Sequence, residues 1–389
     1  MTNLILALWI TLGTIHFGIP FAYFLVMRRV ASQRSYQLAS SLESEPSVSI
    51  IVPTYNEASV IETKLSNIVE NGYPSQKLQF IVVDSASTDG TADRARRFIE
   101  QHNLRGEVIE ETSRTGKSGA LNLGLTHATG ELICTSDAEC VWDKDALRNG
   151  VRYFSDPRIG SVSGVHRISA AGTLAGNVEG SYRSVYRTLR IGESKLSSTP
   201  IGEGEIQLFR RAEFPGFDPR VGGDDTCGAL CMIEKGFRSI SAEDVMFMDP
   251  APPAWAARFR QKIRRGQHVL QAFFKHKRLL WGPGNFSRII FPMEFFIYAV
   301  NPLLFPLVIV FTAAVVLTTP LIGIVIAAGL VLSTIIPTLR TTLGTYISNN
   351  ITMIAAVAQE ARGNKQLVWT KIDENRPVNQ PPSQSIIAN

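Results

Sequence analysis

Two carboxylates one residue apart, Asp137 and Glu139, directly follow the segment Glu131–Ser136, which has the pattern of a buried strand. Carboxylate oxygens at this spacing are ligands that suit Mg²⁺ or Mn²⁺. Acidic pairs this close are also common on protein surfaces without any ligand. The position directly after a buried strand favours a metal site, so we predict one at Asp137 and Glu139.

Two other expected strands also end in polar residues. Strand Val48–Val52 leads into Pro53–Glu57, and strand Leu78–Asp84 leads into a turn rich in Ser and Thr that contains Asp89. Helix capping and an Asp-Gly turn would explain each segment by itself. Because parallel strands bring their carboxyl ends to one edge of a sheet, the pair of segments favours a ligand site there.

A lysine beside a glycine marks the start of another expected helix. The segment Arg114–Ser118 resembles a phosphate-binding loop, but Glu111 stands where that motif requires glycine, and a P-loop is therefore excluded. Lys117, next to Gly116, could still bind an anion or a diphosphate at the helix start. A solvated basic loop is the alternative.

The elements that must position these residues alternate between buried strands and amphipathic helices. The expected helices are Glu57–Asn71, Thr91–Gln101 and Ser118–Thr126. This β-α-β-α order predicts a parallel sheet, and therefore an α/β fold, within the region 46–286.

Long apolar segments flank this region. Leu4–Met27 carries no charge and is followed at once by Arg28 and Arg29, so we expect a membrane-spanning helix with Met1 outside and the α/β domain in the cytoplasm. The chain should then be a multi-pass protein of the cell membrane.

The chain of 389 residues divides accordingly. We expect an N-terminal transmembrane helix at 1–28, the α/β domain at 46–286 with an amphipathic helix near 255–277 that lies on membrane lipids, two transmembrane helices at 289–340, an interfacial or transmembrane helix at 341–362, and a cytoplasmic tail at 363–389. Residues 343–360 are too polar for a clear span, and we interpret them as interfacial.

Charge and cysteine usage narrow the class of protein. The net charge of +5 would suit nucleic acid, phosphorylated substrates or an anionic membrane surface, but the chain has no lysine-rich tail, so nucleic acid is not an expected partner. The four cysteines lack C-x-x-C spacing and are expected to be ordinary reduced thiols; they are Cys134, Cys140, Cys227 and Cys231.

Taken in order, the motifs resemble those of glycosyltransferase family 2. The resemblance is carried by Val52–Glu57, by Asp84 with Asp89-Gly90-Thr91, by Gly116-Lys117 through Asn122, and by Asp137-Ala138-Glu139. It extends into the membrane segments in the style of hyaluronan, chitin and poly-N-acetylglucosamine synthases. It implies a GT-A, Rossmann-like domain and metal-dependent transfer of a sugar from a nucleotide diphosphate, with inversion and with UDP as the expected nucleotide.

The resemblance also implies roles for individual residues. Asp225 would be the catalytic base with Asp224 beside it, and Arg264 would face the diphosphate. Glu139 replaces the second Asp that the family usually has among its metal ligands. Donor-binding residues would be Pro53, Tyr55, Glu57, Asp84, Asp89, Lys117, Asp137, Gln261 and Arg264, and acceptor-side residues would be Gly202, Glu203 and Arg265. A helix cap ahead of Thr226–Glu234 is the alternative for Asp225 and can coexist with catalysis.

The chain departs from the family at Arg265, where the Q-x-x-R-W motif has Trp. Arginine offers no flat apolar surface to a sugar but can bind phosphate or carboxylate oxygens. We therefore expect a lipid-linked or glycan acceptor that carries an anionic group. A processive polysaccharide synthase that exports its polymer is the alternative. Trp369 and Arg376 resemble the closing segment of the family and imply a tail beside the site.

Two hypotheses that assign the chain to other functional classes are disfavoured. A membrane-anchored nucleotide-binding regulator with a degenerate site would not need Asp137, Asp225 and Arg264 together. A transporter would need more than three clear spans and a buried charge cluster within them.

Overall fold

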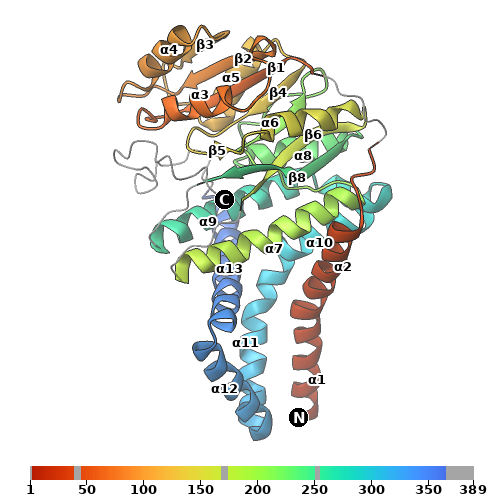
Figure 1. Cartoon of the computed structure of the whole chain (residues 1–389). Helices are drawn as coiled ribbons and strands as arrows, with labels where there is room; N and C mark the ends of the chain where they lie inside the picture. Colours follow the sequence, from red (N-terminus) through yellow and green to blue (C-terminus); the bar gives the residue numbers. More distant parts are fainter. Residues whose placement is uncertain (1, 39–44, 168–173, 250–254, 365–389) are drawn as a thin grey trace.

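The computed structural model describes residues 2–38, 45–167, 174–249 and 255–364. An α/β unit occupies one end of the molecule, and long helices extend away from it to the N-terminus (Figure 1). Two helices lie between these parts. The expected α/β fold with helices before and after it is confirmed. Trp369, Arg376 and the expected tail from 365 onward lie outside the described residues.

The eight strands form one sheet in the order β3-β2-β1-β4-β7-β6-β8-β5. Their bounds are β1 Val48–Thr54, β2 Leu78–Asp84, β3 Gly106–Glu110, β4 Leu132–Thr135, β5 Val141–Trp142, β6 Ile159–His166, β7 Gln207–Arg210 and β8 Arg238–Met248. The expected parallel pairing is confirmed for β1, β2 and β4, with β3 parallel to β2. Beyond β4 the sheet is mixed, because β7 runs antiparallel to both β4 and β6.

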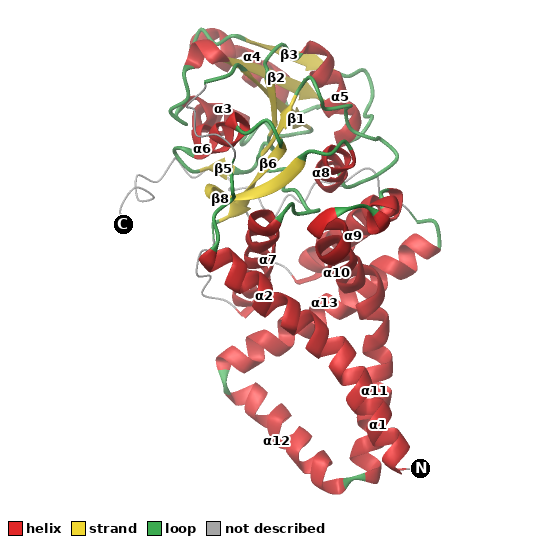
Figure 2. Cartoon of the chain, turned by 90° about the vertical axis from the view of Figure 1, so that its right-hand side faces the viewer, coloured by secondary structure: helices red, strands yellow, loops and turns green. Residues whose placement is uncertain are grey.

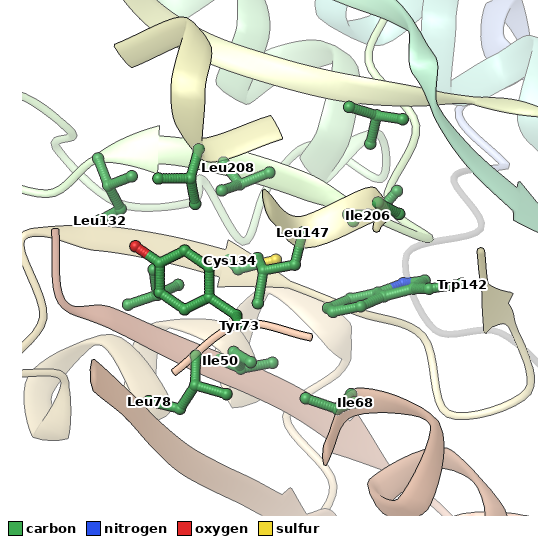
Figure 3. Packing of buried hydrophobic residues seen from close by; sticks show 14 of the residues in the cluster. Ile50, Ile68, Tyr73, Leu78, Leu132, Cys134, Trp142, Leu147, Ile206 and Leu208 are labelled. Carbon is green, nitrogen blue, oxygen red and sulfur yellow. The ribbon is translucent and has the colours of Figure 1, made fainter. Parts of the chain in front are cut away.

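The helices of this unit pack on the two faces of the sheet. They are α3 Ile61–Val69, α4 Thr91–Gln101, α5 Lys117–His127, α6 Ala146–Arg152 and α8 Asp224–Glu234, with short 3₁₀ turns η2 Ser75–Lys77 and η3 Tyr153–Ser155. One face buries a core that includes Ile50, Leu78, Trp142 and Leu208 (Figure 3). The other buries Ile51, Val83 and Phe209. The β1 and β2 strands are apolar on both faces, as buried parallel strands must be.

Helices α7 Leu174–Leu196 and α9 Trp255–Lys275 form the layer between the sheet and the long helices (Figures 1 and 2). Helix α9 occupies the segment near 255–277 in which we expected a helix, whereas the sequence patterns did not predict α7. At Gly192 of α7, a Cβ atom would lie only 2.3 Å from the carbonyl oxygen of Met27. Glycine therefore lets α7 pack directly on the N-terminal helix.

Three long helical segments extend from this layer. Two are long and apolar enough to cross a membrane: Thr2–Gln33 and Phe286–Thr318. The former comprises α1 Thr2–Gly13, η1 Thr14–Gly18 and α2 Ile19–Gln33; the latter comprises η5 Phe286–Ile290, α10 Phe291–Phe295, η6 Phe296–Val300 and α11 Asn301–Thr318. The 3₁₀ turn η4 Lys277–Trp281 precedes the second segment. By length and composition, they match the expected first and second spans.

The third segment is a bent pair, α12 Pro320–Ile335 and α13 Pro337–Ala361, whose axes differ by 107°. Together the pair would supply a third span by length and composition. Residues 343–360, which we interpreted as interfacial, belong to α13, and this helix packs on both α9 and α7. A Cβ at Gly266 of α9 would lie 3.0 Å from Met353 Sδ and 3.1 Å from Ala356 Cβ. Helix α13 therefore packs closely on α9, and its polar residues Thr345, Asn350 and Thr352 are buried.

Candidate active site

Two adjoining cavities open where the strand ends meet α8 and α9. The smaller one is lined by Pro53, Thr54, Tyr55, Glu57, Ser85, Arg114, Gly116 and Ala138–Glu139, together with residues that it shares with the larger one. The shared wall consists of Lys117, Asp137, Gln261, Arg264 and Arg265. Gly202, Glu203, Asp224 and Asp225 line the larger cavity. The fold thus brings most of the predicted site residues together, from segments more than a hundred positions apart.

Asp84 and Asp89 are the exceptions, because neither is among the described residues that line these two cavities. Asp84 is buried and accepts hydrogen bonds from the hydroxyl of Thr54 (3.0 Å) and the backbone N–H of Ser87 (2.9 Å). Asp89 accepts one from the backbone N–H of Ala58 (3.1 Å). These two carboxylates hold the loops after β1 and β2 in place.

The loop after β1 presents Tyr55 to the smaller cavity, where the guanidinium of Arg114 stacks on its ring at 3.8 Å from the centroid. Such a stack is stabilised by the ring quadrupole and forms a flat polar and aromatic surface. Asn56, next to it, has a positive φ of 55°, a left-handed conformation that Asn tolerates well. The turn at Asn56 aims Tyr55 and Glu57 at the cavity.

Lys117 occupies the centre of the shared wall. Its Nζ lies 2.7 Å from Asp137 Oδ1 and 3.4 Å from Asp224 Oδ2. Burial by itself would lower the pKa of Lys117, but Asp137 and Asp224 outweigh burial and raise it well above its ordinary value. At Gly204 a Cβ would stand 2.9 Å from Lys117 Nζ, so glycine leaves room for this ammonium group.

Asp225 stands in the first turn of α8. Its Oδ1 accepts a hydrogen bond from the backbone N–H of Thr226 (2.6 Å) and its backbone oxygen accepts one from Gln207 Nε2 (3.1 Å). Burial and the neighbouring charge of Asp224 raise the pKa of Asp225 to about 6. A carboxylate with such a pKa is more basic than an exposed one and is suited to accept a proton. We gave a helix cap ahead of Thr226 as the alternative role of Asp225. Because α8 already begins at Asp224, Asp225 lies inside the first turn of the helix and is not its cap.

Gln261 and Arg264 enter both cavities from α9. Burial and the neighbouring Arg265 lower the pKa of Arg264 to about 10. The Arg264 Nε atom is buried and has no hydrogen-bond partner among the described residues. An unsatisfied, buried guanidinium N–H beside Asp137 and Asp224 is a site at which an anion would be stabilised.

An alternating network of charges borders the larger cavity. Arg265 lies 3.5 Å from both Glu205 Oε1 and Asp249 Oδ2, Arg190 pairs with Glu203, and Arg183 lies 3.6 Å from Asp249. Burial and Glu205 raise the pKa of Asp249 to about 7. Two of the predicted acceptor residues, Glu203 and Arg265, thus belong to a network of arginines and carboxylates.

His166, Glu203 and Glu205 come close enough to be considered as metal ligands, since their ligand atoms all lie within 4.8 Å of one another. Arg183 contacts His166 Nδ1 at 2.8 Å. A guanidinium can only donate, so Nδ1 must accept and the neutral ring carries its proton on Nε2, toward Glu203. Because Nε2 then has no lone pair for a metal and both glutamates pair with arginines, we interpret this group as a polar network.

The sequence patterns did not predict that α7 contributes residues to the site. The larger cavity is also lined by Tyr182, Arg183, Tyr186, Arg187 and Arg190 of α7, and by Tyr298, Asn349, Thr352 and Met353. The spacing of Arg183, Arg187 and Arg190 places them on one face of a helix, which is the signal that could have revealed them. Nothing in the sequence marked α13 as a wall of the site.

Comparisons with known proteins agree with this geometry. The family described as "Glycosyl transferase family 2" matches residues 49–214. A solved structure of the mannosyltransferase PcManGT from Pyrobaculum calidifontis, in complex with GDP-Man and Mn²⁺, is 35% identical; the match covers 93% of this chain and all of that one, with a TM-score of 0.80.

Curated sequence relatives are more distant. The probable glycosyltransferase YdaM of Bacillus subtilis is 29% identical over 66% of this chain and 63% of its own length. The poly-beta-1,6-N-acetyl-D-glucosamine synthase of Staphylococcus epidermidis is 24% identical over 49% of this chain and 46% of its own length. The match therefore spans less than two thirds of either relative. With the match along the full length of PcManGT and the ordered motifs, the comparisons lead to one conclusion: the chain belongs to glycosyltransferase family 2 and has the GT-A fold of that family.

Proposed function

We propose that this chain transfers a sugar from a nucleotide diphosphate donor, with inversion, to a lipid-linked or glycan acceptor at the cytoplasmic face of a membrane. The observation that carries this proposal is the position of Lys117 between Asp137 and Asp224, in the wall that both cavities share. A donor in the smaller cavity would bring its diphosphate to this wall. An acceptor in the larger cavity would approach it from the opposite side, next to Asp225.

The proposed reaction is a single displacement. Asp225 removes the proton from the acceptor hydroxyl as that oxygen attacks the anomeric carbon, and the bond between this carbon and the diphosphate oxygen breaks. The raised pKa of about 6 keeps Asp225 mostly ionised at neutral pH while making it a stronger base. The hydrogen bond from the backbone N–H of Thr226 holds the Asp225 carboxylate in one orientation. Less side-chain freedom of Asp225 is therefore lost when the reaction occurs.

The leaving diphosphate needs positive charge rather than a proton. Lys117 and Arg264 supply it from the shared wall. Pro53, Tyr55 and Glu57 form the opposite wall of the smaller cavity and are placed to contact the nucleoside. Asp84 and Asp89 would then act on the donor through the loops they hold, and we propose no direct contact for them.

A divalent cation fits the donor set at Asp137 and Glu139. Both side chains line the smaller cavity, and the ammonium group of Lys117 stands 2.7 Å from Asp137 Oδ1, which supports the idea that this carboxylate attracts cations into the cavity. When bound, Mg²⁺ or Mn²⁺ would neutralise charge on the diphosphate. The presence of Mn²⁺ in the PcManGT structure supports this assignment.

The donor is best identified by a panel of nucleotide sugars. Purified protein would be mixed with Mn²⁺ and each sugar nucleotide, and release of nucleoside diphosphate and product mass would be measured. GDP-mannose comes first because PcManGT was solved with GDP-Man, and UDP sugars follow because of the family resemblance. Turnover with none of them, in the presence of extracted membrane lipids as acceptors, would contradict the proposal.

A processive synthase is the second candidate, because several of the relatives are poly-beta-1,6-N-acetyl-D-glucosamine synthases of staphylococci. Arg265 argues against it, since the aromatic platform expected for a growing glycan is missing there. Product size decides between the two functions. Long polymer formed without a lipid acceptor would favour the synthase, whereas addition of one or a few sugars to a lipid would favour the transferase.

The proposed orientation can be tested by cysteine labelling. Three of the four native cysteines are buried, so replacing the partly exposed Cys231 should give a low background. In that variant, a cysteine at Asn389 should react with an impermeant maleimide only after the membrane is opened. A cysteine at Thr2 is the control and should react in intact cells. Labelling of position 389 in intact cells would mean that the C-terminus lies outside.

A further inference from the structure

The larger cavity has a basic wall that the proposed reaction does not use. Arg183, Arg187 and Arg190 line it from α7, spaced so that they share one helix face, and Lys262 lines it from α9. Lys262 Nζ lies 4.3 Å from the centre of the Tyr182 ring. These four cations line the larger cavity and are not among the residues that line the smaller one.

The three arginines differ in their partners. Arg190 pairs with Glu203, and Arg183 pairs with Asp249 while it also donates to His166. Arg187 has no ion pair or hydrogen bond with any described residue, although it lines the same cavity. A guanidinium that lines a partly dehydrated cavity without an anion is stabilised when a phosphate or carboxylate binds to it. Arg187 is therefore the member of the row whose charge is available to a ligand.

Part of the cavity wall is uncharged and comes from the long helical segments. Tyr186 of α7 and Tyr298 of η6 both line it, with ring centres 5.9 Å apart. Met353 and Thr352 of α13 line it as well. Tyr298 belongs to the helix Phe286–Thr318, which is long and apolar enough to cross a membrane. One cavity is thus lined by Asp225, by the arginines of α7 and by residues of the long helical segments.

We propose that Arg187 binds a phosphate group of a polyisoprenyl-type lipid acceptor, whose apolar chain leaves the cavity past Tyr298 and Met353 into the bilayer. The lining of the cavity fits such an amphiphile, because it combines the proposed base Asp225, the guanidinium of Arg187 and the aromatic and apolar side chains of Tyr186, Tyr298 and Met353. This inference rests on the proposed function, because it takes the larger cavity as the acceptor site. It adds the chemical class of that acceptor and the residue that selects it.

The test measures lipid binding without any donor. Full-length protein in detergent would be titrated with polyisoprenyl monophosphate, uncharged polyisoprenol, phosphatidylglycerol and inorganic phosphate, and bound ligand would be counted by native mass spectrometry. We expect polyisoprenyl monophosphate to bind best, and Arg187→Ala to weaken it roughly tenfold or more, the loss expected for a charged hydrogen-bond partner. Arg187→Lys should retain part of the affinity.

Arg278→Ala is the matched control, because it removes one exposed arginine of η4 that lies outside both cavities. It should leave the affinity within about twofold, as expected for a screened surface charge. Equal affinity in wild type and Arg187→Ala, or equal loss in Arg278→Ala, would overturn the proposal. So would binding of inorganic phosphate or phosphatidylglycerol as strong as that of polyisoprenyl monophosphate.

A second readout separates this inference from the proposed function. If transfer from a nucleotide sugar occurs but Arg187→Ala leaves the KM for a lipid-phosphate acceptor unchanged, the transferase assignment stands and the role of Arg187 fails. If lipid binding depends on Arg187 but no nucleotide sugar is turned over, the proposed function fails while the lipid site stands. Elution volume and circular dichroism of each variant exclude misfolding as the cause.

Discussion

The two cavities that meet at Lys117 are built in different ways. The smaller cavity, which we propose as the donor side, takes most of its residues from the end of β1 and from the segments that follow β1, β2, β3 and β4, between positions 53 and 139. The larger cavity, which we propose as the acceptor side, combines residues of α7, α8, α9, the loop before β7, η6 and α13. Local loops at parallel strand ends therefore define one side, and packing between the domain and the long helices defines the other.

This difference also appears in the electrostatics. On the donor side, the loop carboxylates Asp84 and Asp89 are satisfied by hydrogen bonds from neighbouring loops. On the acceptor side, arginines and carboxylates from distant elements balance one another, as in the pairs of Arg265 with Glu205 and Asp249. Changes on the proposed donor side should alter the rate of sugar transfer to any acceptor. Changes on the proposed acceptor side should alter which molecule receives the sugar.

The largest effect is expected at the junction of the two sides. Asp225→Asn keeps the size of the side chain but removes the base, so we expect transfer to fall by about 10³-fold or more. Donor affinity, measured by isothermal titration, should stay within a few-fold. Asp93→Asn, an exposed change on α4, is the control and should leave turnover near wild type. Turnover of Asp225→Asn close to wild type would remove Asp225 as the base.

A change at the proposed metal site should come next in size. Asp137→Ala removes a proposed metal ligand and a partner of Lys117, so we expect weaker donor binding and a rate loss of about 10²-fold. The concentration of Mn²⁺ required for half-maximal rate should rise. Lipid binding, measured without donor, should not change. Full activity of the wild-type protein in excess EDTA would contradict a metal at this site.

A change at Arg265, which lines both cavities and which we propose acts on the acceptor, should be smaller. Arg265→Trp introduces the residue that the family motif has and removes the contacts with Glu205 and Asp249. We expect the acceptor KM to change only about tenfold, because the two ion-pair contacts that are lost are partly exposed and each is worth little, and we expect the donor KM to change less. Kinetics with each substrate varied in turn would measure both values. A shift in donor KM alone would place Arg265 on the donor side.

The smallest effect is a shift in pH dependence. Because Asp225 must be ionised to act as a base and has a pKa of about 6, kcat/KM should fall tenfold per unit below pH 6 and level off above it. Burial and, second to it, the charge of Asp224 raise the pKa of Asp225, so Asp224→Asn should shift the acidic fall in kcat/KM to lower pH. If kcat/KM falls at the same pH in both proteins, another group controls the pH dependence.

The sequence by itself predicted the strands and loops that form the proposed donor side of the site. Strand Leu78–Asp84 and helix Thr91–Gln101 have the predicted bounds, and Glu131–Ser136 contains β4, so Asp137 was placed correctly at a strand end. Such predictions succeed because the periodicity of buried strands and the polar residues at their ends are local signals. The roles proposed for Asp225 and Arg264 came from the order of motifs, and the structure brings both residues to the cavities.

Only the tertiary structure showed which helices form the proposed acceptor side of the site. Helix α7 carries Arg187, and α13 brings Met353 to the same cavity, yet the sequence patterns did not predict α7 and indicated only an interfacial helix for α13. Their positions depend on the close approach of α7 to α2 at Gly192, on that of α9 to α13 at Gly266, and on the bend of 107° between α12 and α13. Which face of a helix meets a cavity is set by its packing partners, and these lie too far away in the sequence for local patterns to identify them.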